Sequence, residues 1–113
     1  EEIVREIENN CMAIRQSKDW KQELHWKDYN AFCDTVDHYF MLLATKLKAT
    51  NKLEEKEIRL CILVMLDMDN ITIAKTINYA PNGVGKYKYR IAQKLGTKIK
   101  DMRQFLIEMA IGR

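Results

Sequence analysis

Proline and glycine are scarce in this sequence of 113 residues, which has one proline and four glycines. That composition, together with 47% hydrophobic residues, excludes a disordered or loop-rich chain and favours helices. No apolar run approaches the ~20 residues that a membrane-spanning helix needs, and no cleavable signal peptide is visible. The first residue is Glu1 and not methionine. We therefore expect a fragment of a longer cytoplasmic protein, folded as one all-α domain.

Cysteine and histidine are also few. Cys11, Cys33 and Cys61 are far apart, and an odd number without short spacings argues against a disulfide framework and a zinc site. We expect them to be small core residues, with no metal and no cofactor. Cys33 and His38 are five residues apart, so on one helix they point away from each other and make a poor nucleophile–base pair. Since residues 83–86 also lack the spacing of a phosphate-binding loop, we expect no enzyme activity.

Three helical segments separated by two short turns organise the C-terminal half. The segments are 54–66, 70–77 and 82–95. Asp69 is a candidate N-cap for the second segment, and Pro81 suits the first position of the third. Gly96 is suited to a left-handed helix end. Two helices joined by a tight turn, the second of them basic, are typical of a helix-turn-helix that enters the major groove of DNA.

Charge is unevenly distributed along the chain. Residues 1–50 contain nine acidic and seven basic residues, a net charge of −2, whereas residues 51–113 contain seven acidic and twelve basic residues, a net charge of +5. The stretch of residues 86–100 contains no acidic residue and six basic ones: Lys86, Lys88, Arg90, Lys94, Lys98 and Lys100. Such a run indicates either a phosphate-binding face or a merely solvated one.

The C-terminal half resembles the LuxR-type (GerE-like) DNA-binding domain, in a match that covers roughly residues 20 to 110. The family pattern opens with L-T-x-x-E, continues with N-x-E-I-A and closes with I-x-x-K-L. The matching residues here are Leu53, Glu57, Asp69–Ala74, Ile77, Tyr79, Val84, Ile91 and Lys94–Leu95. The chain is most similar to C-terminal domains of Bacteroidetes-type transcriptional regulators, through Arg59–Leu63 and the stretch Ala80–Leu95. Many positions agree at fixed spacing, which makes the resemblance specific.

The resemblance implies a LuxR-like tetrahelical helix-turn-helix bundle at residues 51–113, with an N-terminal helical extension at residues 1–50. It implies a sequence-specific transcriptional regulator whose recognition helix, at about 81–95, binds the major groove. The DNA-binding residues expected on this register are Asn82, Gly83, Gly85, Lys86, Lys88, Tyr89, Arg90 and Lys94. The partners expected are double-stranded DNA, a second copy of the chain and RNA polymerase, without membrane contact by this fragment.

Three positions depart from the family pattern. Ala80 replaces an N-cap serine, a loss of ~1 kcal/mol in helix-end stability. Gly83 replaces a threonine, and Gly85 occupies a contact position; each interior glycine costs a helix ~1 kcal/mol relative to alanine. Asn82 is a candidate replacement cap that would start the helix at Gly83. We expect the N-terminal end of this helix to become fully ordered on DNA.

The N-terminal half carries apolar stripes. One stripe, in an amphipathic helix from residue 1 to about 17, consists of Val4, Ile7, Cys11 and Ile14. It packs either on its own domain or on a partner copy, as in a coiled coil. A second stripe predicts one long helix from about residue 20 or 26 to residue 48, with Leu42 widening its buried face. In the last amphipathic helix, Met102, Phe105 and Met109 are candidates for a dimer contact or for a cap over the core.

A different class of function is a helical protein–protein module, in which a degenerate helix-turn-helix serves dimerisation or output in signalling. Salt dependence separates the two, because phosphate contacts release counterions and weaken steeply as salt rises.

Overall fold

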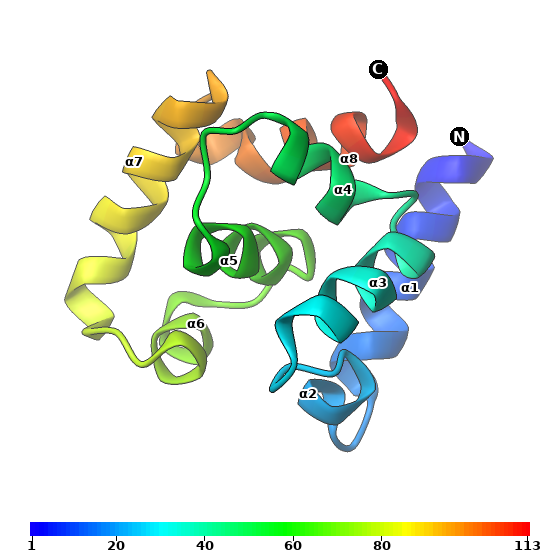
Figure 1. Cartoon of the computed structure of the whole chain (residues 1–113), viewed down its shortest axis with the longest axis horizontal. Helices are drawn as coiled ribbons and strands as arrows, with labels where there is room; N and C mark the ends of the chain where they lie inside the picture. The colour runs from blue at the N-terminus through cyan, green and yellow to red at the C-terminus, as the bar shows by residue number, and fades with distance from the viewer.

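A computed structural model describes all residues, 1–113, and its regular elements are all helical, without a strand, which confirms the all-α expectation. Figure 1 shows the arrangement of the helices around α5. The elements are α1 (Glu2–Gln16), α2 (Trp20–Glu23), α3 (Tyr29–Tyr39), α4 (Leu43–Ala49), α5 (Glu55–Met65), α6 (Asn70–Ile77), the 3-10 turn η1 (Pro81–Gly83), α7 (Val84–Leu95), the 3-10 turn η2 (Ile99–Asp101) and α8 (Met102–Ile111). None of the helices combines the length and the apolar character that crossing a bilayer requires.

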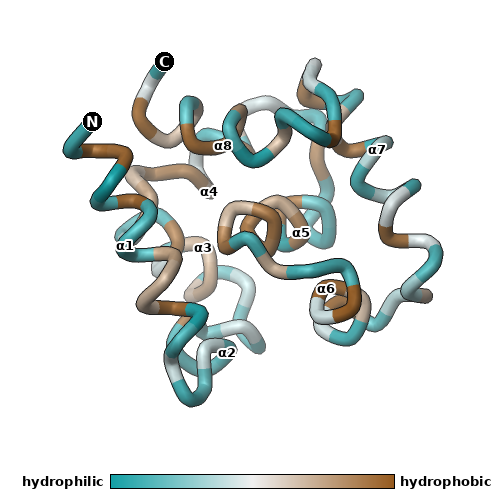
Figure 2. Tube along the Cα trace, turned by 180° about the vertical axis from the view of Figure 1, so that it is seen from behind, coloured by the Kyte–Doolittle hydropathy of each residue, from teal (hydrophilic) through white to brown (hydrophobic).

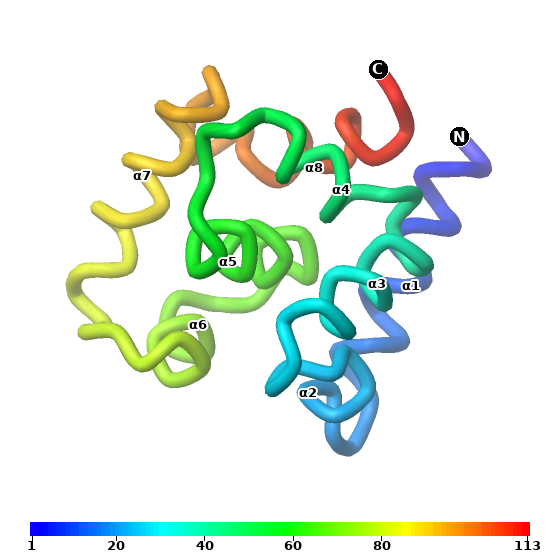
Figure 3. The backbone as a smooth tube through the Cα atoms, viewed as in Figure 1, coloured from blue at the N-terminus to red at the C-terminus, as the bar shows by residue number.

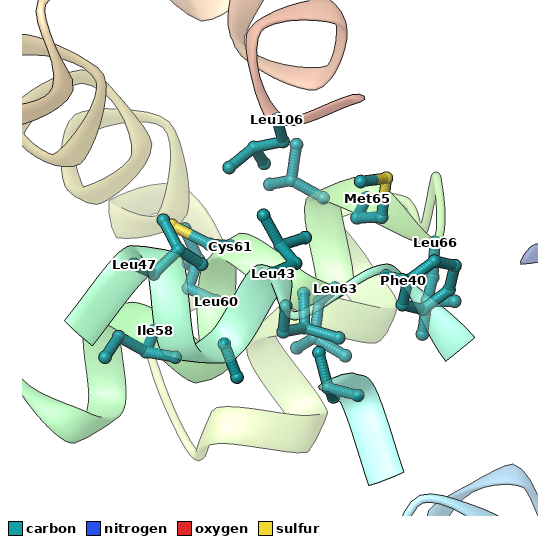
Figure 4. Packing of buried hydrophobic residues seen from close by; sticks show 14 of the residues in the cluster. Phe40, Leu43, Leu47, Ile58, Leu60, Cys61, Leu63, Met65, Leu66 and Leu106 are labelled. Carbon is teal, nitrogen blue, oxygen red and sulfur yellow. The ribbon is translucent and has the colours of Figure 1, made fainter. Parts of the chain in front are cut away.

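Helix α5 lies at the centre of the core. It begins with a capping box, in which the Glu54 backbone N–H donates to Glu57 Oε1 at 2.8 Å. Eight of its last nine residues are buried, since only Arg59 among residues 57–65 is partly exposed. Figure 4 shows the packing of α5 side chains with Leu43 and Leu47 of α4 and Leu106 of α8. The helix predicted for residues 54–66 is thus present, and it forms the middle of the core.

The prediction of one long helix from about residue 20 or 26 to residue 48 is wrong. Three helices, α2, α3 and α4, take its place, with sharp breaks that are visible in the backbone trace (Figure 3). The breaks contain His25, Met41 and Leu42, whose φ angles are 55°, 53° and 66°. Left-handed residues of this kind cannot continue a right-handed helix. Leu42 is 55% exposed because it lies in the second break, so it does not widen the buried face.

The N-terminal stripe packs on its own domain. Ile7, Cys11 and Ile14 are fully buried within the single chain, and α1 contacts α2 and α8. Polar contacts hold the same helix: Arg15 Nη1 donates to the Leu66 carbonyl at 2.7 Å, and Arg103 of α8 forms an ion pair with Glu8. The three buried side chains are therefore part of the monomer core and do not offer a surface to a second copy.

One hydrophobic cluster of 31 buried residues joins the two halves of the chain. It includes residues of α1, α3 and α4 as well as residues of α5 to α8. The expected division between residues 1–50 and 51–113 falls in the loop between α4 and α5, where Asn51 has a φ of 58°. The extension is thus packed against the C-terminal half. Helix α7 lies at the edge of the molecule opposite α1 (Figure 1).

Candidate nucleic-acid interface

Helices α6 and α7 are joined by a short turn that begins with a left-handed residue. Asp69 caps α6, accepting a hydrogen bond from the Thr72 backbone N–H at 2.7 Å, as predicted. Ile73, Ala74 and Ile77 form the buried face of α6. Asn78, with φ 57°, ends α6 and directs the chain into the turn. Both α6 and α7 contact η1, so the turn is packed between them.

The basic segment begins differently from the prediction. Pro81 occupies the first position of η1, as expected, but α7 starts only at Val84. Asn82 makes no capping hydrogen bond, so it is not a replacement cap. The first turn of the segment is therefore a 3-10 turn. Neither the start of η1 nor the start of α7 has a side-chain cap. Gly96, with φ 83°, ends α7 in the left-handed conformation, which confirms its predicted role.

The glycine at position 83 has a steric explanation that could not be predicted from the sequence. A Cβ atom at this position would lie 2.9 Å from Cε2 of Tyr79, closer than real contacts allow. The Tyr79 ring stacks on the Tyr87 ring, with centroids 5.0 Å apart and planes 13° apart. Tyr87 is itself buried on the inner face of α7. The absence of a side chain at residue 83 thus makes room for the aromatic stack. At Gly85, by contrast, the space around the missing Cβ is open.

Helix α7 packs through one face and leaves the other to solvent. The buried residues of α7 are Val84, Tyr87, Ile91, Ala92 and Leu95. Hydrophilic and hydrophobic stretches alternate along its trace in Figure 2. Six of the eight predicted DNA-binding residues are exposed: Asn82, Gly85, Lys86, Tyr89, Arg90 and Lys94. Gly83 and Lys88 are partly buried. The eight residues lie on η1 and α7.

Two lysines of α7 are already engaged within the fold. Lys94 Nζ lies 2.7 Å from Oε2 of Glu57, whose side chain is only 6% exposed. Lys88 Nζ donates to Asn70 Oδ1 at 3.1 Å, and burial lowers the pKa of Lys88 below its usual value. Lys94 thus neutralises a buried carboxylate, whereas Lys88 contacts only a neutral amide. The other four basic residues of the run make no ion pair: Lys86, Arg90, Lys98 and Lys100.

A hollow of about 510 Å³ opens on the outer side of α7. It is lined by Tyr79, Gly83, Lys86, Tyr89 and Arg90, without any carboxylate. An Arg90 N–H donates to the Tyr79 hydroxyl oxygen at 3.5 Å, and a Gln93 N–H donates to the Tyr89 hydroxyl oxygen at 3.0 Å. Sequence reasoning missed Tyr79 because it occupies a position where the pattern places an apolar core residue.

The residues predicted for dimerisation divide into two groups. Ile7, Cys11, Ile14 and Met102 are fully buried in the monomer. Val4, Phe105 and Met109 are partly buried against the same core. Met102 therefore belongs to the core, as the alternative of a cap had allowed. Among large apolar residues the most exposed are others: Met12, Leu42, Ile71, Tyr89 and Ile99.

Comparison with known proteins gives no further guide to this interface. No family model matches the chain, and neither the curated proteins nor the solved structures include a match to it. The chemistry of the exposed face of α7 is therefore the basis on which a function has to be inferred.

Proposed function

We propose that this domain is a DNA-binding transcriptional regulator of the LuxR-like helix-turn-helix type, in which α5 to α8 correspond to the four helices and α7 enters the major groove. A second copy of the chain reads a second half-site, and RNA polymerase is the further partner, in the cytoplasm. The observation that carries the proposal is the outer face of α7. It presents hydrogen-bond donors and cations, with no acid between Lys86 and Lys100.

The position of α7 supports this proposal. The helix lies at the edge of the molecule (Figure 1), and Lys86, Tyr89 and Arg90 on it are exposed. Its inner face holds it to the core through buried residues, which fixes the direction of the exposed side chains. Lys86 and Tyr89 then face the bases, while Arg90, Lys98 and Lys100 contact phosphates. Lysine donates to guanine O6 and N7, and a tyrosine ring packs on a thymine methyl group.

The charge available for phosphates is smaller than the sequence implied. Lys94 is committed to Glu57, and Lys88 is partly buried. Three to four phosphate contacts by one chain correspond to a loss of about 40-fold to 150-fold in affinity between 50 and 200 mM salt. A single domain therefore binds weakly, and a dimer on two half-sites accounts for specific binding.

The test is fluorescence anisotropy of a labelled 20-bp duplex titrated with the chain at several salt concentrations. We expect measurable binding at 50 mM salt and the steep salt dependence stated above. The variant K86A/K88A/R90A is expected to abolish binding. The control R5A/K18A/K27A removes the same charge from exposed residues of the N-terminal half and is expected to bind as the wild type does. Binding that survives the first triple substitution would refute the proposal.

A second candidate, the protein-interaction module, is favoured by exposed apolar side chains on α6 and in η2. Ile71 of α6 is 61% exposed and Ile99 is 41% exposed. This candidate predicts no binding of duplex even at low salt. An I71A/I99A variant would then lose a protein contact while its behaviour with DNA remained unchanged.

A further inference from the structure

The polar side chains that line the hollow beside α7 are all hydrogen-bond donors. Lys86 and Arg90 are cations that make no ion pair. The hydroxyl groups of Tyr79 and Tyr89 accept hydrogen bonds, from Arg90 and Gln93 respectively, and neither donates its own proton to a protein acceptor. Every side chain with a polar group in this hollow thus has a donor to offer. An anion with several acceptor oxygens satisfies such a set, and no neutral or cationic group does so equally well.

The Tyr79 ring is held in place before any ligand arrives. It stacks on the ring of Tyr87 and covers Gly83, whose missing Cβ leaves the necessary space. Lys56 Nζ lies 5.3 Å from the centre of the Tyr79 ring, and the Arg90 guanidinium lies 5.6 Å from that of Tyr87. Cations over the ring faces attract the aromatic quadrupole. These contacts hold the ring, and its hydroxyl group lies beside Arg90 in the lining of the hollow.

From these contacts we infer that the hollow binds one phosphodiester of the DNA backbone, and that Tyr79, which precedes α7, is one of its ligands. The inference rests on the proposed function, since the duplex supplies the phosphate. Tyr79 donates its hydroxyl proton to a phosphate oxygen while it accepts from Arg90, and Arg90 supplies the positive charge. Gly83 makes no contact with the phosphate; its role is to admit the Tyr79 ring. Such a contact fixes the register of the recognition helix on the duplex.

The experiment compares Y79F with Y39F in the same duplex-binding assay. Y79F removes one hydroxyl group and retains the ring, its stack and its fit to Gly83. We expect about a tenfold loss of affinity, as for a hydrogen bond to a charged group. The salt slope should be unchanged, because no charge is removed, whereas R90A should reduce the slope by about one. Y39F is the matched control, since the Tyr39 hydroxyl contacts Glu23, on α2.

Two further variants separate a phosphate ligand from a merely structural residue. G83A forces the Tyr79 ring to move, so it should weaken DNA binding. In an R90A background Y79F should still weaken binding, since the hydroxyl reaches the phosphate itself. No effect of Y79F in that background would reduce Tyr79 to a residue that positions Arg90 and overturn the assignment. Wild-type binding with an unchanged Y79F would overturn this inference alone, while absence of wild-type binding would overturn the proposed function with it.

Discussion

Replacement of Lys94 by alanine tests whether this lysine belongs to the fold or to the DNA interface. Its ammonium group is 2.7 Å from the carboxylate of Glu57, whose side chain is 6% exposed, while the Lys94 side chain is 43% exposed. Removal of one partner of a fully buried pair costs 3–5 kcal/mol, roughly, and loss of a surface pair about 0–1 kcal/mol. Glu57 keeps its hydrogen bond from the Glu54 N–H. We therefore expect K94A to lower the free energy of unfolding by about 2 kcal/mol.

Urea denaturation followed by circular dichroism measures this loss, with K86A as the matched control. Lys86 lies on the same helix, is exposed and makes no ion pair, so K86A should change stability by less than about 0.5 kcal/mol. The substitution E57Q in the K94A background should recover part of the loss, because it removes the unpaired buried charge. A stable K94A variant that instead lowers the salt slope of DNA binding by one would show that the ion pair is unimportant and that Lys94 contacts phosphate.

The remaining predictions concern stability, pH and thiol reactivity. Arg59 lies over the ring of Trp26 at 4.7 Å and donates to the Trp26 carbonyl, so R59A should cost about 2 kcal/mol and R59K should not restore it, as measured by urea denaturation with tryptophan fluorescence. The Arg103 hydrogen bonds lower the pKa of Glu8, and the Thr72 N–H lowers the pKa of Asp69, from ordinary values of 4.5 and 3.8. Both carboxylates therefore stabilise the fold fully above those values, and the urea midpoint should fall as the pH decreases below them, less so in the E8Q and D69N variants. All three cysteines are buried, and burial raises the pKa of the Cys61 thiol to about 12, so a thiol-reactive disulfide dye at pH 8 should modify them only after unfolding.

The helices of the C-terminal half were predictable because local signals and apolar spacing agree there. Each of three residues marks a helix end: Asp69 by its side-chain hydrogen bond, Pro81 by its fixed φ, and Gly96 by its left-handed backbone. Helix α6 has the predicted bounds, since its cap and its buried face leave no other register. Helix α7 has the predicted end but a later start, because Asn82 does not cap it.

The breaks between α2, α3 and α4 were not predictable from spacing. His25, Met41 and Leu42 are left-handed without being glycine or asparagine, so the sequence carries no local signal for a turn. The second apolar stripe does not reveal the break between α3 and α4 either, because Phe40 and Leu43 are buried on the two sides of that break. A continuous helix and a broken one place these side chains in the same core.

Two features of the candidate interface could not be predicted from the sequence and became apparent only in the folded structure. In the sequence, Lys94 and Lys86 both belong to the basic run and cannot be told apart. In the structure, Lys94 faces the buried Glu57 of α5. Gly83 resembles a lost contact in the sequence, but the ring of Tyr79 occupies the space where its side chain would lie. A glycine four residues after a tyrosine is a weak signal, which becomes interpretable only with the turn between them.

The two chain ends meet at one corner of the molecule, where Arg113 forms an ion pair with Glu1 (Figure 1). That corner is remote from α7. Any polypeptide fused to either end therefore emerges on the far side from the basic helix and leaves it unobstructed. A short linker between the ends would close the chain into a ring, and new ends could be opened at an exposed loop without disturbing the recognition surface.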